Sequence, residues 1–113
     1  MWEERPRTGK LRNNMLTGKQ RSYLKGLAMQ LEPVVYIGKN ELTDSVLKEM
    51  DDYLEAHEMV KVKIQEGSMM DPKTAANEAA AKLGAEFVQA IGRKFTLYRE
   101  SKDNKQIFIP GKK

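Results

Sequence analysis

The 113-residue sequence contains no cysteine and only one histidine. The missing cysteines exclude disulfide bonds, thiolate zinc sites and cysteine nucleophiles, and they fit a reducing compartment. No stretch approaches the roughly 20 apolar residues that a membrane-spanning helix needs, and residues 1–15 lack the apolar region of a secretory signal. We therefore expect a cytoplasmic protein that does not enter a membrane.

The sequence is also poor in side chains that could support catalysis. His57 lies among acidic residues at the end of a predicted helix, where it complements the helix C-terminus. Asp51, Asp52 and Glu55 share a predicted helix face, and such neighbours are more often solvated than bound to a metal. There is neither a P-loop nor a GxGxxG motif. We predict no catalytic residue, no metal and no cofactor, and therefore no enzyme.

Charge is distributed unevenly along the chain. Residues 1–30 hold seven basic and two acidic residues, residues 92–113 hold the same numbers, and residues 44–58 hold one basic and six acidic residues. Each end thus carries +5 and the middle carries −5, within a net charge of +4. A segregated basic surface is typical of proteins that bind a polyanion, although basic ends also serve solubility.

Length and apolar periodicity predict one domain. Residues 1–14 show no apolar period and are expected to form a flexible extension, residues 15–110 form the domain, and residues 111–113 are a basic tail. We expect helices after Thr17, Thr43 and Asp71, since each of these side chains can cap a helix N-terminus. The first helix should bury five side chains: Tyr23, Leu24, Leu27, Ala28 and Leu31.

Four strands are expected, at residues 34–37, 59–64, 87–91 and 94–99. The first reads as a buried strand, and the last two form a hairpin. The element order is α-β-α-β-α-β-β, which favours parallel neighbours joined by helices. With the antiparallel hairpin added, the prediction is an α/β fold with a mixed four-stranded sheet packed on helices. Residues 107–109 form either a last short strand or a surface segment.

The loop after the first strand, Gly38-Lys39-Asn40-Glu41, is the clearest candidate for a binding element. It leads into the helix that Thr43 caps. Backbone N–H groups at a helix start favour an anion, and a glycine lets a phosphate approach the main chain. RNA-binding modules of the KH type use a GxxG loop in this way. The alternative is an ordinary connection between a strand and a helix.

A second candidate surface is one face of the sheet. Lys61 and Lys63 alternate with apolar residues along their strand, and Thr96 and Tyr98 share one face of the last strand. If this face is open, its lysines and the tyrosine could contact RNA. The alternative is that the lysines only keep an outward face soluble.

Several motifs together resemble those of the bacterial YhbY family, the stand-alone form of the CRM RNA-binding domain that plants use in organelle intron splicing. The resemblance covers roughly residues 15–110. The matching segments are Leu16-Thr17-Gly18-Lys19-Gln20, Leu24-Lys25-Gly26-Leu27-Ala28, Glu32-Pro33-Val34-Val35, Ile37-Gly38-Lys39-Asn40, Leu42-Thr43, Val60-Lys61-Val62-Lys63, Ile91-Gly92-Arg93-Lys94 and Leu97-Tyr98-Arg99.

The resemblance implies a fold similar to the C-terminal domain of translation initiation factor 3. It also implies binding of structured RNA, with 23S ribosomal RNA in large-subunit precursors as the partner and ribosome assembly as the role. Ribosomal proteins are a further expected contact, and the protein is expected to be a monomer. The RNA-binding residues expected from loop, charge and resemblance are Gly38, Lys39, Asn40, Lys19, Arg21, Lys25, Arg93, Lys94, Lys61 and Lys63.

The loop departs from the family motif at its fourth position, where Glu41 replaces glycine. A glycine would adopt a positive φ freely and admit a phosphate. A glutamate adds a negative charge that could cost about 1 kcal/mol near a phosphate. We therefore expect the flanking basic residues to contribute alongside the loop.

One alternative function remains open from the sequence. The acidic outer face of the second helix could dock on a basic protein, and the protein would then be an interaction module. Reversing the charges of Asp51 and Asp52 would separate the two functions, because it should abolish protein contact and leave RNA binding intact.

Overall fold

A computed structural model of the chain describes residues 18–39, 41–101 and 107. The predicted extension, the basic tail, Thr17, Asn40 and residues 108–109 lie outside the described residues. Within them, the predicted element order is confirmed. The elements are α1 (Gly18–Ala28), β1 (Val35–Ile37), α2 (Asp44–His57), β2 (Met59–Ile64), α3 (Pro72–Leu83), β3 (Glu86–Ile91) and β4 (Lys94–Tyr98).

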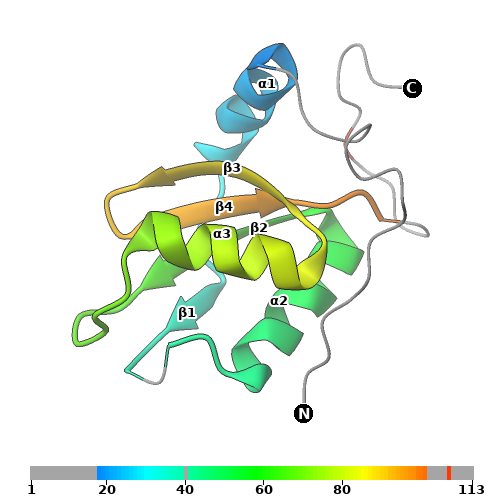
Figure 1. The fold of residues 1–113 in the computed structure, drawn as a ribbon. Helices are drawn as coiled ribbons and strands as arrows, with labels where there is room; N and C mark the ends of the chain where they lie inside the picture. The colour runs from blue at the N-terminus through cyan, green and yellow to red at the C-terminus, as the bar shows by residue number, and fades with distance from the viewer. Residues whose placement is uncertain (1–17, 40, 102–106, 108–113) are drawn as a thin grey trace.

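The four strands form one mixed sheet in the order β1-β2-β4-β3 (Figure 1). β1 pairs with β2 in parallel, and β4 runs antiparallel to both of its neighbours. The mixed sheet is as predicted, but β2 and β3 are not neighbours, because β4 folds back from β3 and inserts between them. The carboxyl ends of β1, β2 and β3 therefore meet the start of β4 at one end of the sheet.

Helices α2 and α3 cover one face of the sheet and enclose the main core. Thr43 caps α2 by accepting a hydrogen bond from the backbone N–H of Val46 at 3.1 Å, and Asp71 caps α3 in the same way. Gly84 ends α3 in the left-handed conformation, with φ 67°. The small side chains of α3 let it approach the sheet closely. The buried alanines of this helix are Ala75, Ala76, Ala79 and Ala80.

Helix α1 packs on the opposite face and covers only part of it; Figure 1 shows it separated from α2 and α3, beyond β3. Leu24 and Ala28 are buried as predicted, but Tyr23 and Leu31 remain 41% and 37% exposed. Leu31 lies beyond the end of the helix at Ala28, whereas Tyr23 lies within the helix but outside its buried side. Its buried side contacts residues from three strands: Met59, Val88 and Tyr98.

The condition that the sheet face carrying Thr96 and Tyr98 is open is not met at these two residues. Tyr98 is only 2% exposed because it packs under α1, and Thr96 is fully buried beside it on the same face. Burial raises the pKa of the Tyr98 hydroxyl above its ordinary value, and the charge of Glu58 raises it further. Tyr98 is therefore part of the core.

Strand β1 is also less buried than predicted. Val35 and Ile37 face the main core, whereas Tyr36 is 47% exposed and Val34, just before the strand, is 37% exposed. The reason is the strand's position at the edge of the sheet, on the side that α1 does not reach. Strand β1 is therefore buried on the side of Val35 and Ile37 and exposed on the side of Tyr36.

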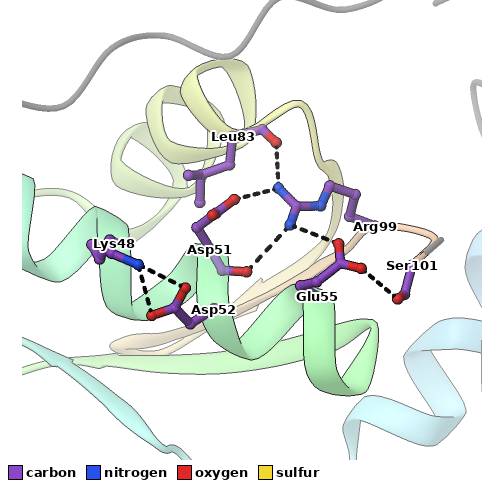
Figure 2. A network of polar contacts seen from close by, with 7 residues as sticks. All are labelled: Lys48, Asp51, Asp52, Glu55, Leu83, Arg99 and Ser101. Carbon is purple, nitrogen blue, oxygen red and sulfur yellow. Dashed lines mark hydrogen bonds and ion pairs between the residues drawn. The ribbon is translucent and has the colours of Figure 1, made fainter. Parts of the chain in front are cut away.

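The predicted acidic outer face of α2 is partly wrong. Asp51 is only 7% exposed, and its carboxylate accepts a hydrogen bond from Arg99 Nη1 at 2.7 Å (Figure 2). Arg99 also donates to the carbonyl oxygen of Leu83 at 2.9 Å. By contrast, Asp52 is exposed and pairs with Lys48 at 3.0 Å. Arg99, just after β4, thus fastens α2 to the end of α3.

Glu58 follows α2 and is fully buried, although it belongs to the acidic segment 44–58 and its charge would favour the surface. Its φ of 70° ends the helix in the left-handed conformation. Its carboxylate accepts hydrogen bonds from the backbone N–H groups of Ser101 at 2.8 Å and Ile107 at 2.7 Å. Ile107 is partly buried against the α1 core, and Glu58 therefore anchors the chain after β4.

Candidate nucleic-acid interface

Three connections gather at the end of the sheet where β1, β2 and β3 finish, on the left in Figure 1. They are the loop after β1, the loop after β2 and the hairpin turn at residues 92–93. The backbone N–H of Gln65 donates to the carbonyl of Ile37 at 2.9 Å, which joins the first two loops. The candidate loop and the hairpin therefore lie at the same end of the sheet.

Arg93 fastens the hairpin to the loop after β2. Its Nε donates to the carbonyl of Ile64 at 3.0 Å, and its Nη2 donates to the carbonyls of Gln65 at 3.0 Å and Ser68 at 3.2 Å. That loop in turn borders the candidate loop, since a Cβ on Gly67 would lie 3.9 Å from Cγ of Lys39. Arg93 was predicted to contact RNA; here its guanidinium orders the surface beside Lys39.

The candidate loop turns tightly into α2. The backbone N–H of Glu41 donates to the carbonyl of Gly38 at 3.0 Å, and the N–H of Thr43 donates to the carbonyl of Glu41 at 3.0 Å. Glu41 has φ 61°, a left-handed conformation that glycine adopts without steric cost. This explains in physical terms why a glycine suits the fourth position. Lys39 is exposed and makes no hydrogen bond or ion pair with a described residue.

Two lysines face each other across neighbouring strands. The strand register places Lys63 of β2 directly opposite Lys94 of β4. Both are exposed, and neither has a hydrogen bond or ion pair with a described residue. We call them the lysine pair. Like charges directly opposite in a sheet repel each other, so this arrangement is unfavourable until an anion neutralises it.

The lysine pair belongs to a row that crosses the whole sheet. Tyr36 of β1 lies beside Lys63, and Ile91 of β3 lies beside Lys94. Tyr36 and Ile91 are 47% and 57% exposed, because α1 ends before it reaches this row. We call these four residues the open face. The alternation predicted for β2 is confirmed, but the exposed aromatic ring is that of Tyr36 and not that of Tyr98.

The remaining predicted residues lie elsewhere. Lys61 Nζ donates to the carbonyls of Ala28 at 3.1 Å and Leu31 at 3.3 Å, so this lysine caps the C-terminal end of α1. Arg21 Nε donates to the carbonyl of Phe87 at 3.2 Å, near the start of β3 and away from the hairpin turn. Lys19 and Lys25 are exposed on α1. The structure therefore separates Arg21 from the candidate loop.

Comparisons with known proteins agree with this architecture. The family model described as the CRS1/YhbY (CRM) domain matches residues 16–99. The chain belongs to this family. The resemblance predicted from the motifs is thus confirmed, whereas the likeness of the fold to translation initiation factor 3 stays a prediction.

Two curated relatives of this CRM protein cover most of its length. It is 38% identical to the "Probable RNA-binding protein YqeI" of Bacillus subtilis over 85% of this chain and 100% of the relative. It is 40% identical to an "RNA-binding protein" of Haemophilus influenzae over 86% of this chain and 97% of the relative. The solution structure of the Staphylococcus aureus protein SAV1595 is 41% identical and aligns with a TM-score of 0.73, covering 85% of this chain and 100% of that one.

The described residues of this CRM protein give little support for a metal site, a catalytic histidine or a membrane-spanning helix. No group of three or more histidine, aspartate and glutamate side chains among the described residues is placed to hold a metal ion. His57 is exposed, with its ring centroid 4.3 Å from that of Tyr53. None of the described helices is long and apolar enough to cross a membrane.

Proposed function

We propose that this CRM protein binds RNA without catalysing a reaction, and that its partner is 23S ribosomal RNA in precursors of the large ribosomal subunit. Its role would be that of an assembly factor in the cytoplasm, acting as a monomer with ribosomal proteins nearby. The observation that carries the proposal is the lysine pair. Relatives named as RNA-binding proteins support the RNA-binding part of this proposal.

The physical argument starts from the cost of the lysine pair. Two exposed lysines directly opposite each other on neighbouring strands repel each other, and no described carboxylate pairs with either. A phosphate group at this position would turn that repulsion into attraction and release counterions on binding. Lys39 and the N-terminus of α2 lie at the same end of the sheet, so a longer stretch of RNA backbone could extend from one to the other.

The alternative of protein docking through α2 has weaker support. Asp51 was one of its two named contact residues, but it is occupied by Arg99 and almost fully buried. Asp52 is exposed, yet it already pairs with Lys48. Charge reversal at Asp51 would therefore disturb folding, so this substitution cannot separate protein docking from RNA binding.

Filter binding to a 23S ribosomal RNA fragment at several salt concentrations tests RNA binding. Lys63→Ala and Lys94→Ala should each weaken binding about threefold to tenfold and lower the salt slope by about one. Lys82→Ala is the matched control, because Lys82 lies in the last turn of α3, on the other face of the sheet and at the end away from the three connections. Equal losses in all three variants would mean that only net charge matters, and the proposed interface would be wrong.

The assembly role needs a separate measurement. In cell extracts the protein should sediment with precursors of the large subunit, and the Lys63→Ala/Lys94→Ala double variant should shift toward the free fractions. If the wild-type protein sediments only as free protein while still binding RNA in solution, the assembly role fails and RNA binding stands.

A further inference from the structure

A pocket of about 340 Å³ opens on the α1 side of the sheet, next to the open face. It lies where the end of α1 meets the middle of β2, β4 and β3. This volume is at the small end of ligand pockets, which span roughly 300–1,000 Å³, so it suits one ring system. Its main lining residues are Met29, Lys61, Gln89, Ile91, Lys94 and Thr96.

The hydroxyl group of Thr96 is the unusual feature of this pocket. Thr96 is fully buried, and its Oγ1 has no hydrogen-bond partner among the described residues. Buried polar groups are nearly always paired, and leaving one unpaired destabilises a protein. A valine of nearly the same shape would avoid this cost. The threonine therefore suggests a partner that arrives from outside the chain.

The pocket walls combine apolar surface with one amide. Met29 and Ile91 are 65% and 57% exposed. The amide of Gln89 makes one weak contact, from Nε2 to the Met29 sulfur at 3.8 Å, which leaves its carbonyl oxygen available. Lys94, which belongs to the lysine pair, lines the rim. A flat ring with polar edges and an attached phosphate would match all of these groups.

We infer that this pocket receives one unpaired nucleobase of the bound RNA, an inference that rests on the proposed function. The ring would lie between Met29 and Ile91, its polar edge would meet Gln89 and Thr96, and its phosphate would lie near the lysine pair. Because the Thr96 hydroxyl is fully buried, entry requires side-chain movement at the rim, where Lys94 is free of described partners. Bases inside a double helix cannot reach such a pocket, whereas bulged or looped bases can be splayed out.

The test compares a fully paired RNA hairpin with a hairpin that carries one bulged nucleotide. The bulged hairpin is made in four versions, with adenine, guanine, cytosine or uracil at the bulge. The wild-type protein should bind at least one bulged hairpin about tenfold more tightly than the fully paired hairpin. Thr96→Val should remove most of this preference while leaving binding to the paired hairpin unchanged. The same variant should unfold about 4 °C higher, because it no longer buries an unpaired hydroxyl.

A second pair of variants keeps the test decisive if Thr96→Val disturbs the fold. Met29→Ala removes one pocket wall and should lower the preference for the bulged hairpin about threefold. Met69→Ala is the matched control, since Met69 is 91% exposed on the loop after β2 and does not line the pocket. It should keep the full preference.

The outcomes separate this inference from the proposed function. If the wild-type protein binds both hairpins equally, or if Thr96→Val and Met29→Ala both retain the preference, the pocket does not hold a base while RNA binding stands. An abasic bulge that binds as tightly as the four bases would overturn the inference in the same way. If neither hairpin binds with a steep salt dependence, the proposed function fails as well.

Discussion

The two faces of the sheet differ in how they are covered. On the face under α2 and α3, polar side chains near the core are paired, as in the contacts of Arg99 with Asp51 and Leu83 (Figure 2). On the α1 face, the lysine pair has no described partner and the Thr96 hydroxyl is unpaired. The first face is arranged for stability, whereas the second keeps unfavourable features that only a partner from outside the described residues could relieve.

A parallel contrast separates the three described arginines from Lys39 and the lysine pair. Arg21, Arg93 and Arg99 each donate to backbone carbonyls and hold segments of this chain together. Lys39 and the lysine pair extend into solvent without such contacts. The guanidinium fork suits several fixed acceptors at once, and the ammonium group is a mobile charge. Basic residues near the interface are therefore not equivalent, and mutations should distinguish them.

The largest expected effect is on the covered face. Asp51→Asn should lower the free energy of unfolding by about 2–3 kcal/mol, because the largely buried Arg99 then keeps only its longer ion pair with Glu55, at 3.7 Å. Asp52→Asn removes the same charge from the exposed pair with Lys48 and should change stability by about 0.5 kcal/mol or less. Urea unfolding of both variants measures the difference. Equal stabilities would break the comparison between the two faces.

A smaller effect is expected in the candidate loop. Lys39→Ala should weaken binding to the 23S ribosomal RNA fragment about threefold and leave the unfolding midpoint unchanged, since this exposed lysine has no described partner. Filter binding and thermal unfolding of the same sample provide both values. Unchanged affinity would restrict the interface to the lysine pair and the sheet.

The smallest effect is expected at Glu41. Glu41→Gly should raise RNA affinity about twofold to threefold at low salt, because it removes a carboxylate near the phosphate path. Its stability should change by about 0.5 kcal/mol or less, since relief of the left-handed backbone is offset by the freedom of glycine in the unfolded chain. Glu41→Gln removes the charge and keeps the side chain, and it therefore separates electrostatics from backbone shape. Weaker binding by Glu41→Gly would contradict this account.

Local patterns in the sequence were enough to predict the helices and strands. Thr43, Asp71 and Gly84 lie at helix ends because their side chains or backbone freedom act within a few residues. The alternation in β2 predicted which side of the strand carries Lys61 and Lys63. The tight hairpin between β3 and β4 was likewise predicted from Gly92 and the strands that flank it.

The failures came from contacts between distant segments. Asp51 and Arg99 lie 48 residues apart, and no local pattern distinguishes Asp51 from the exposed Asp52. The burial of Tyr98 and the exposure of Tyr36 depend on how far α1 extends across the sheet. The position of Tyr36 between Val35 and Ile37 already indicated that it faces the opposite side of the strand. However, a short apolar run looks alike in an edge strand and in a fully buried strand, so the sequence could not predict that this side is exposed.

By itself, the sequence determined the helices and strands, the position of the candidate loop, the excess of basic residues and membership of the CRM family. These depend on residues close together in the chain or on recognisable motifs. Only the tertiary structure decided which charges remain available. It buried Asp51, Glu58 and Thr96, tied Lys61 and Arg93 to backbone carbonyls, and placed the lysine pair on an open surface. Whether a charged side chain is free to bind a partner depends on which segments cover each face of the sheet. That packing joins distant segments, so no short stretch of sequence predicts it.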